Sequence, residues 1–241
     1  MIYPDDSIQS LVANCEWWEA TSEKKPTRGN LVFAFVPHVD QIPYTIKEVA
    51  RSKAKEHNTG IIDIAPLEMK KPKRREDLPV AAMTLHDNEL WLAYRGKKRP
   101  CLVLGTTHPD VDNALRINMP RRSTDQVILA APYYGVDQDG TRAGYNPQLV
   151  ERIRHAEYAR FFWDKLPTKT KPEESILRLD HTQPIGIKNN SCELSGFRLS
   201  GKAMTIIDHW MSWLLWGGVP PKSPLKEYRS VIVDIFGYSG E

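Results

Sequence analysis

The sequence is short of the residues that build metal sites and disulfides. Among its 241 residues are three cysteines, Cys15, Cys101 and Cys192, with no C-x-x-C pair, and seven histidines scattered along the chain. Neither pattern has the ligand spacing of a zinc site, and unpaired cysteines are typical of reduced thiols in the cytoplasm. We therefore expect a cytoplasmic protein whose function uses no metal.

The signatures of nucleotide-dependent and common hydrolytic enzymes are also missing. The chain has no G-x-x-x-x-G-K-[ST] or G-x-G-x-x-G segment to cradle a phosphate, and no G-x-S-x-G or H-E-x-x-H. We accordingly expect no cofactor. The formal net charge is only +3, so the charge total does not by itself indicate a nucleic-acid partner.

Long apolar runs are scarce as well. The N-terminus, MIYPDDSIQS, carries acids where a secretory signal needs a basic start and an apolar stretch. The most apolar segment, residues 203–219, contains Asp208 and His209 and is too short to span a bilayer comfortably. We expect a soluble protein that does not bind a membrane.

The composition is that of a globular chain, 41% hydrophobic and 26% charged, and residues 1–241 are treated as one domain. Short apolar runs bounded by turn residues predict strands, and apolar residues at three- and four-residue steps predict helices. The strands are expected at 31–36, 60–69, 80–85, 89–94, 100–105, 126–134, 175–181 and 230–236. The helices are expected at 5–22, 45–58, 147–164 and 201–216, the last with Ser200 as N-cap.

These elements predict an α+β, mainly β fold with a short-strand antiparallel core. The core would comprise residues 29–37, 80–135 and 174–216. Helical insertions would occupy residues 38–79 and 136–173.

A cluster of cations, GKKRP, stands at the mouth of the predicted strand 100–105. Pro100 restricts the local backbone, so Arg99 could clamp a phosphate and stabilise charge developing on it. Lys97 and Lys98 would attract an anionic backbone. The alternative is a turn whose charges only interact with solvent.

A second candidate lies in ILRLDHTQP, residues 176–184. Side chains alternate along a strand, so Arg178 and Asp180 should share a face and could act as an acid–base pair, or as a base beside a phosphate clamp. An ion pair on the sheet surface is the alternative. His181 should point to the other face unless the strand ends there.

A third candidate, His38, follows the strand predicted at 31–36 and could be an acid–base group or a bystander. Together the candidates describe an arginine-rich site with one carboxylate. RNA cleavage by the substrate's own 2′-hydroxyl needs a base, an acid and cations around the phosphorus. The same residues also suit RNA binding without cleavage.

The motifs resemble, in their order, the PemK/MazF family of toxin endoribonucleases. The segments are G-N-L-V-F-A-F, K-R-P-C-L-V-L-G, V-I-L-A-A-P and S-I-L-R-L-D-H-T-Q-P, followed by an apolar terminal helix. The resemblance implies a small SH3-like antiparallel barrel, here enlarged by the insertions. It also implies an antitoxin partner and a homodimer.

The resemblance further implies roles for individual residues. Arg99 falls on the arginine before proline that holds the scissile phosphate. Arg178 and Asp180 fall on the acid and base of the PemK branch. His38 lies roughly where that branch has a histidine, and His181 replaces the usual glutamine.

Tyr133 and Tyr134 stand where the MazF branch has a threonine, and we expect one or the other to stack on a splayed base. Arg121 and Arg122 would join the lysines in attracting RNA. The implied activity is metal-independent cleavage of single-stranded RNA, which leaves 2′,3′-cyclic phosphate and 5′-hydroxyl ends.

Two alternatives remain open. The first is a non-catalytic barrel that binds RNA or a protein. The second is a toxin inhibited by its own N-terminal region, suggested by the acids Asp5, Asp6, Glu16 and Glu19.

Overall fold

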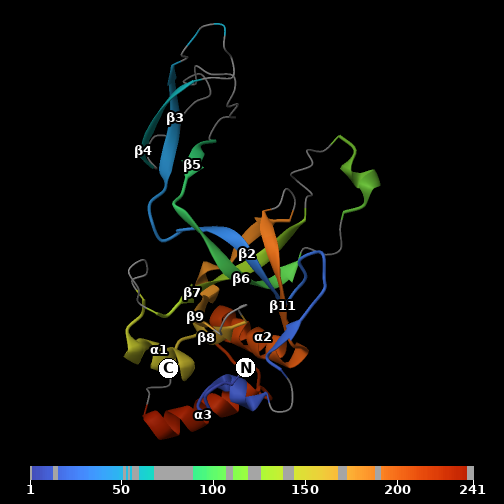
Figure 1. The fold of residues 1–241 in the computed structure, drawn as a ribbon, viewed down its shortest axis with the longest axis vertical. Helices are drawn as coiled ribbons and strands as arrows, with labels where there is room; N and C mark the ends of the chain where they lie inside the picture. Colours follow the sequence, from blue (N-terminus) through green and yellow to red (C-terminus); the bar gives the residue numbers. More distant parts are fainter. Residues whose placement is uncertain are drawn as a thin grey trace. The chain divides into compact units, whose positions relative to one another are not determined.

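The computed structural model divides the chain into two compact units, Met1–Phe35 with Lys98–Glu241, and Val36–Lys97. The fold is α+β and mainly β, with antiparallel sheets, so the predicted fold class is confirmed at this level (Figure 1). The second unit contains the predicted insertion 38–79. The structure describes residues 2–12, 16–50, 53, 55, 60–67, 89–106, 111–118, 126–137, 144–167, 173–187 and 191–237.

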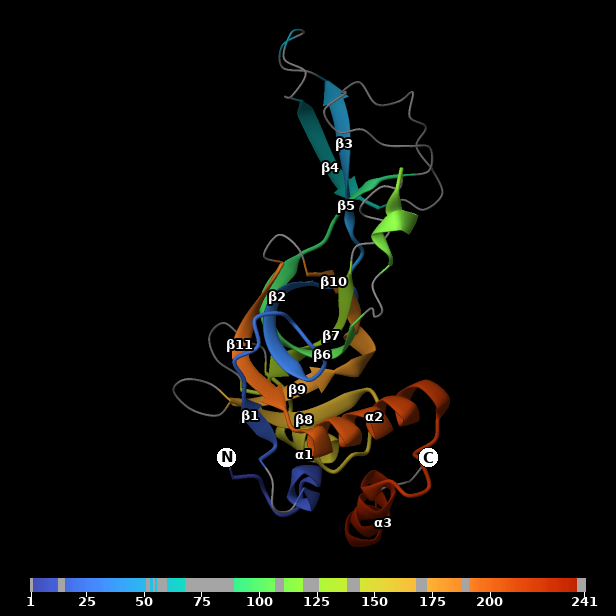
Figure 2. The same cartoon turned by 90° about the vertical axis from the view of Figure 1, so that its right-hand side faces the viewer.

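The main sheet is an open path of seven strands, with an eighth strand, β10, paired to β7. Figure 2 shows β2, β6, β7 and β11 strongly curved. Along the path the strands are β1 (Trp18–Ala20), β11 (Cys192–Leu199), β2 (Asn30–Pro37), β6 (Gly96–Thr106), β7 (Val127–Gly135), β9 (Glu173–Arg178) and β8 (Phe161–Leu166), while β10 spans Gln183–Gly186.

Helices cover both faces of this sheet. Ile176 and Leu177 are neighbours in β9, and successive strand residues point to opposite faces. Leu177 packs in the larger core with Ile207 and Trp210 of α2 (Gly201–Trp216). Ile176 instead joins a smaller cluster with Ile153 of α1 (Pro147–Arg154). The sheet is therefore buried on two sides where these helices pack.

The helix predicted at 201–216 is confirmed with its cap, because the Ser200 hydroxyl accepts a hydrogen bond from the backbone N–H of Ala203. The strand predicted at 230–236 is wrong, because α3 spans Pro224–Phe236. Leu225, Tyr228 and Ile232 lie at helical spacing and are buried in the core. No described helix is long and apolar enough to cross a membrane.

Two further helix predictions are wrong. Within 5–22 the structure has a short 3-10 turn, Ile8–Leu11, and strand β1, whose Trp18 pairs with Leu199 of β11. Within 45–58 it has strand β3 (Tyr44–Ala50), which pairs with β4 (Ile61–Pro66) and β5 (Trp91–Ala93) in the sheet of the second unit. In both cases pairing with a distant strand outweighs the local helical pattern.

The helix predicted at 147–164 is only partly correct, since α1 ends at Arg154 and β8 begins at Phe161. Strands predicted at 31–36, 60–69, 89–94, 100–105, 126–134 and 175–181 correspond to β2, β4, β5, β6, β7 and β9. The strand predicted at 80–85 lies outside the described residues.

Candidate functional site

Three strands bring several of the predicted site residues together around Tyr134. In the register of β6 and β7, Cys101 pairs with Pro132, so Arg99 lies across from Tyr134 two residues further along. Tyr134 in turn pairs with Ile176 of β9, the strand that ends at Arg178. Strand pairing therefore brings Arg99, Tyr134 and Arg178 together, although they are far apart in sequence.

Arg178 and Asp180 form a bidentate ion pair. The Arg178 Nε lies 2.7 Å from one carboxylate oxygen of Asp180, and Nη2 lies 2.8 Å from the other. They were expected to meet as alternate residues of one strand. Instead β9 ends at Arg178, and the 3-10 turn Leu179–His181 brings Asp180 back to it. The side chains are 20% and 27% exposed, so both can be reached from solvent.

The same turn brings His181 into the cluster. The Arg178 Nη2 lies 2.6 Å from His181 Nε2, and the Tyr134 hydroxyl lies 2.9 Å from His181 Nδ1. A guanidinium can only donate, so Nε2 is the acceptor in its contact with Arg178. The imidazole therefore lies between the Arg178 guanidinium and the Tyr134 hydroxyl, and these two contacts orient its ring.

Arg99 approaches Tyr134 from β6. Its guanidinium carbon lies 3.9 Å from the centre of the Tyr134 ring, and that of Arg178 lies 5.8 Å from the same centre. Arg99 forms no ion pair with a carboxylate of the described residues, and its buried Nε has no hydrogen-bond partner among them. Two guanidinium charges therefore face one carboxylate, which favours binding of an anion.

Asp180 is ionised at neutral pH. Partial burial raises the pKa of its carboxyl, but the hydrogen bonds and charge of Arg178 lower it more, so the pKa lies below its ordinary value of 3.8. A carboxylate of this kind accepts protons weakly but orients the guanidinium firmly. The cluster can bind a phosphate and direct charge at it.

Three comparisons with known proteins return no match. The scan of family models returns no match, and neither does the search of curated proteins or that of solved structures. The likeness to PemK/MazF toxins therefore rests on the motif order alone.

Other predicted site residues lie elsewhere. Tyr133 cannot stack on a base, because it is 1% exposed and its hydroxyl donates to buried Asp164 at 3.2 Å. Lys98 is exposed and forms an ion pair with Glu193 at 2.6 Å. His38 and Lys97 belong to the second unit, so they are not placed at the cluster. Arg121 and Arg122 lie outside the described residues.

The acids of the N-terminal region do not pair with the cluster. Asp6 binds Arg154 and His155, each at 2.8 Å. Glu19 lies 3.4 Å from Arg198. These contacts hold the N-terminal region to α1 and β11 instead, and they give no support to a built-in inhibitor acting through these acids.

Sequence reasoning missed the central position of Tyr134, which it placed only as a stacking residue. The signal that could have found it is the register of β6 and β7, which two short apolar runs do not specify. Among the residues that the structure describes, no three His, Cys, Asp or Glu side chains gather to hold a metal ion.

Proposed function

We propose that this protein is an endoribonuclease of the PemK/MazF type, with an SH3-like barrel, that cleaves single-stranded RNA without a metal. One observation carries the proposal. Arg99, Arg178, Asp180 and His181, each chosen from sequence motifs, gather around Tyr134 at a place that solvent can reach. The curved strands of the main sheet support the barrel (Figure 2).

The phosphate of the RNA backbone would occupy the space beside Arg99 and Arg178. The 2′-hydroxyl oxygen forms a bond to phosphorus and gives its proton to Asp180, while the bond from phosphorus to the 5′-oxygen breaks. The two guanidinium groups stabilise the charge of the pentavalent intermediate. Arg178 donates a hydrogen bond to the leaving oxygen, and water supplies its proton.

The exposed side of the cluster suits a single strand whose bases are splayed. The Tyr134 ring already holds Arg99 on its face, so the base would stack on the outer face of this guanidinium, as RNA bases stack on arginine planes. The reaction leaves a 2′,3′-cyclic phosphate and a 5′-hydroxyl.

The test is incubation of the pure protein with a long mixed-sequence RNA in EDTA, followed by analysis of the fragment ends. We expect discrete fragments with 5′-hydroxyl ends, and a loss of at least about 100-fold in rate for Arg178→Ala, Asp180→Asn and Arg99→Ala. Arg198→Ala is the matched control, because Arg198 pairs with Glu19 and makes none of the contacts of this cluster. Intact RNA with the wild-type protein, or full cleavage by an Arg178→Ala, Asp180→Ala variant, would refute the proposal.

One observation favours a second function, RNA binding without cleavage. The low pKa of Asp180 makes its carboxylate a weak base, whereas the paired arginines remain good phosphate ligands. In that case the wild-type protein would bind single-stranded RNA without cutting it. Fluorescence anisotropy with a labelled RNA would then show weaker binding for Arg99→Ala and a smaller dependence on salt.

A further inference from the structure

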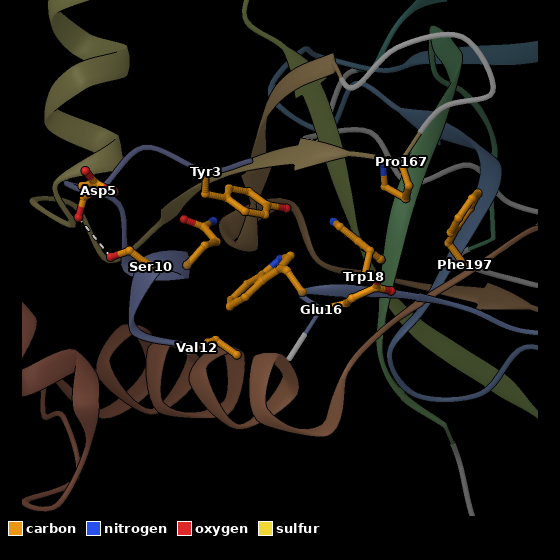
Figure 3. Close-up of a pocket in the computed structure, with 10 residues that line it drawn as sticks. Tyr3, Asp5, Ser10, Val12, Glu16, Trp18, Pro167 and Phe197 are labelled. Carbon is orange, nitrogen blue, oxygen red and sulfur yellow. Dashed lines mark hydrogen bonds between the residues drawn. The ribbon is translucent and has the colours of Figure 1, made fainter. Parts of the chain in front are cut away.

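A pocket of about 520 Å³ lies against the N-terminal segment, and none of its described lining residues belongs to the arginine cluster. Figure 3 shows the residues that line it, with Asp5 and Ser10 on one side, Pro167 and Phe197 on the other, and Tyr3, Glu16 and Trp18 between. Its remaining described lining residues are Gln9, Val12 and Trp17.

The polar atoms of the aromatic residues that line the pocket form hydrogen bonds with other parts of the protein. The Tyr3 hydroxyl donates to one Asp164 oxygen at 3.0 Å, and Trp17 Nε1 donates to the other at 3.2 Å. Trp18 Nε1 donates to the backbone oxygen of Lys165 at 3.0 Å. Because these groups are occupied, the rings offer carbon faces to a ligand, and they are held in place by the contacts behind them.

The charge of the pocket has one sign. Asp5 and Glu16 are acidic, and no basic residue is among the described residues that line it. Gln9 is only 5% exposed. Its Nε2 donates to the backbone oxygen of Trp163 at 2.7 Å, while its Oε1 has no hydrogen-bond partner among the described residues. An N–H donor on a ligand would give this buried oxygen a partner.

We propose that this pocket binds a linear alkylamine with at least two ammonium groups, a diamine or a polyamine. Asp5 and Glu16 occupy different points along the pocket (Figure 3), so they can bind separate ammonium groups of one extended chain. The methylene chain packs on the aromatic walls, and an ammonium near Trp18 is attracted to its indole ring, whereas Trp17 is stacked on Phe162. Gln9 Oε1 accepts an N–H from the ligand. This binding is independent of the proposed RNA cleavage.

The test is titration of the RNA-free protein with spermidine and with cadaverine, followed by Trp fluorescence and calorimetry. We expect saturable binding of both amines and none of 1,5-pentanediol, which has the same chain without charge. Glu16→Gln and Asp5→Asn each keep the shape of the side chain and should weaken binding about tenfold or more. Glu19→Gln is the control, since Glu19 binds Arg198 and does not line the pocket.

Four results would overturn the proposal. They are no saturable binding at millimolar amine, equal binding of the diol, unchanged binding by both acid variants, or binding of a lysine-rich peptide without binding of free amines. Because no RNA is present, the outcome does not depend on whether the arginine cluster cleaves RNA.

Discussion

Burial of the Asp164 carboxyl group should make the protein less stable as the pH rises. Most acidic side chains have the opposite effect, because folding lowers their pKa. The side chain of Asp164 is fully buried and receives four hydrogen bonds. Tyr3 and the backbone N–H of Lys165 donate to one oxygen, while Trp17 and Tyr133 donate to the other. Burial raises the pKa of Asp164 to about 7, and the four donors limit the rise.

Asp164 binds its proton more tightly in the folded protein than in the unfolded chain. The folded-state pKa, about 7, lies above the ordinary value of 3.8, so the folded protein holds a proton that the unfolded chain has released. Stability is therefore lost as the pH rises from the unfolded pKa through the folded one. Between pH 5 and pH 8 the expected loss from this group is about 2 to 3 kcal/mol, at 1.36 kcal/mol per pKa unit.

An Asp164→Asn variant isolates this effect. Its amide cannot titrate, and its NH₂ group faces the Trp17 N–H, which is left without an acceptor at a cost of about 1 to 3 kcal/mol. The free energy of unfolding, measured in urea, should be lower than that of the wild type at both pH values. The gap should widen by about 2 to 3 kcal/mol from pH 8 to pH 5.

Because other titrating groups are shared by the two proteins, they cancel in the difference. Tyr133→Phe is the matched control, since it removes one donor but keeps the carboxyl. Its stability should still fall as the pH rises, at least as steeply as that of the wild type, because the hydrogen bond that it removes lowers the pKa of Asp164. A gap between wild type and Asp164→Asn that is the same at pH 5 and pH 8 would refute this account of Asp164.

Three further predictions concern stability and can be checked by urea unfolding monitored by circular dichroism. Ser200→Ala removes the acceptor for the backbone N–H of Ala203 and should cost about 1 kcal/mol; no change would contradict the cap. Gly29→Ala places a side chain at φ 89°, against Met204, and should cost about 1 to 2 kcal/mol, whereas a stabilised variant would exclude strain there. Trp210→Ala should cost about 3 to 5 kcal/mol, because its ring is 1% exposed in the core, and a loss below 1 kcal/mol would mean that the site collapses around the gap.

The parts of the fold that sequence could predict are those fixed by local signals. The helix at 201–216 has a capping serine before it, a long apolar pattern within it and Gly217 after it in the left-handed conformation. The runs at 31–36 and 126–134 are short, apolar and bounded by turn residues, and both are strands. In these segments the local preference and the tertiary packing agree.

Where local pattern and long-range pairing disagree, the pairing determines the structure. Residues 5–22 have apolar residues at helical steps, yet Trp18 lies in strand β1 and pairs with Leu199 of β11. Residues 45–58 are rich in helix-forming side chains, but Tyr44–Ala50 pairs on both edges with other strands. Neither partner can be identified from the segment itself.

The charged residues of the site could be predicted from the sequence, but the position of Tyr134 at its centre could not. Motifs identified Arg99, Arg178 and Asp180, and the end of β9 brought His181 beside them. Strand alternation implied that Tyr133 and the next residue face opposite ways, but not which one faces the core. That choice depends on the helix α2 and the buried Asp164 behind the sheet, which the motif does not contain.

The N-terminal segment is synthesised long before the groups that bind it. Tyr3 donates to Asp164, 161 residues further along the chain, and the backbone oxygen of Asp6 accepts from Tyr228, 222 residues away. During translation, Trp17 and Trp18 therefore emerge long before the residues that cover them. Folding of this region has to wait until most of the chain has left the ribosome, and incomplete chains expose two tryptophans to chaperones and proteases.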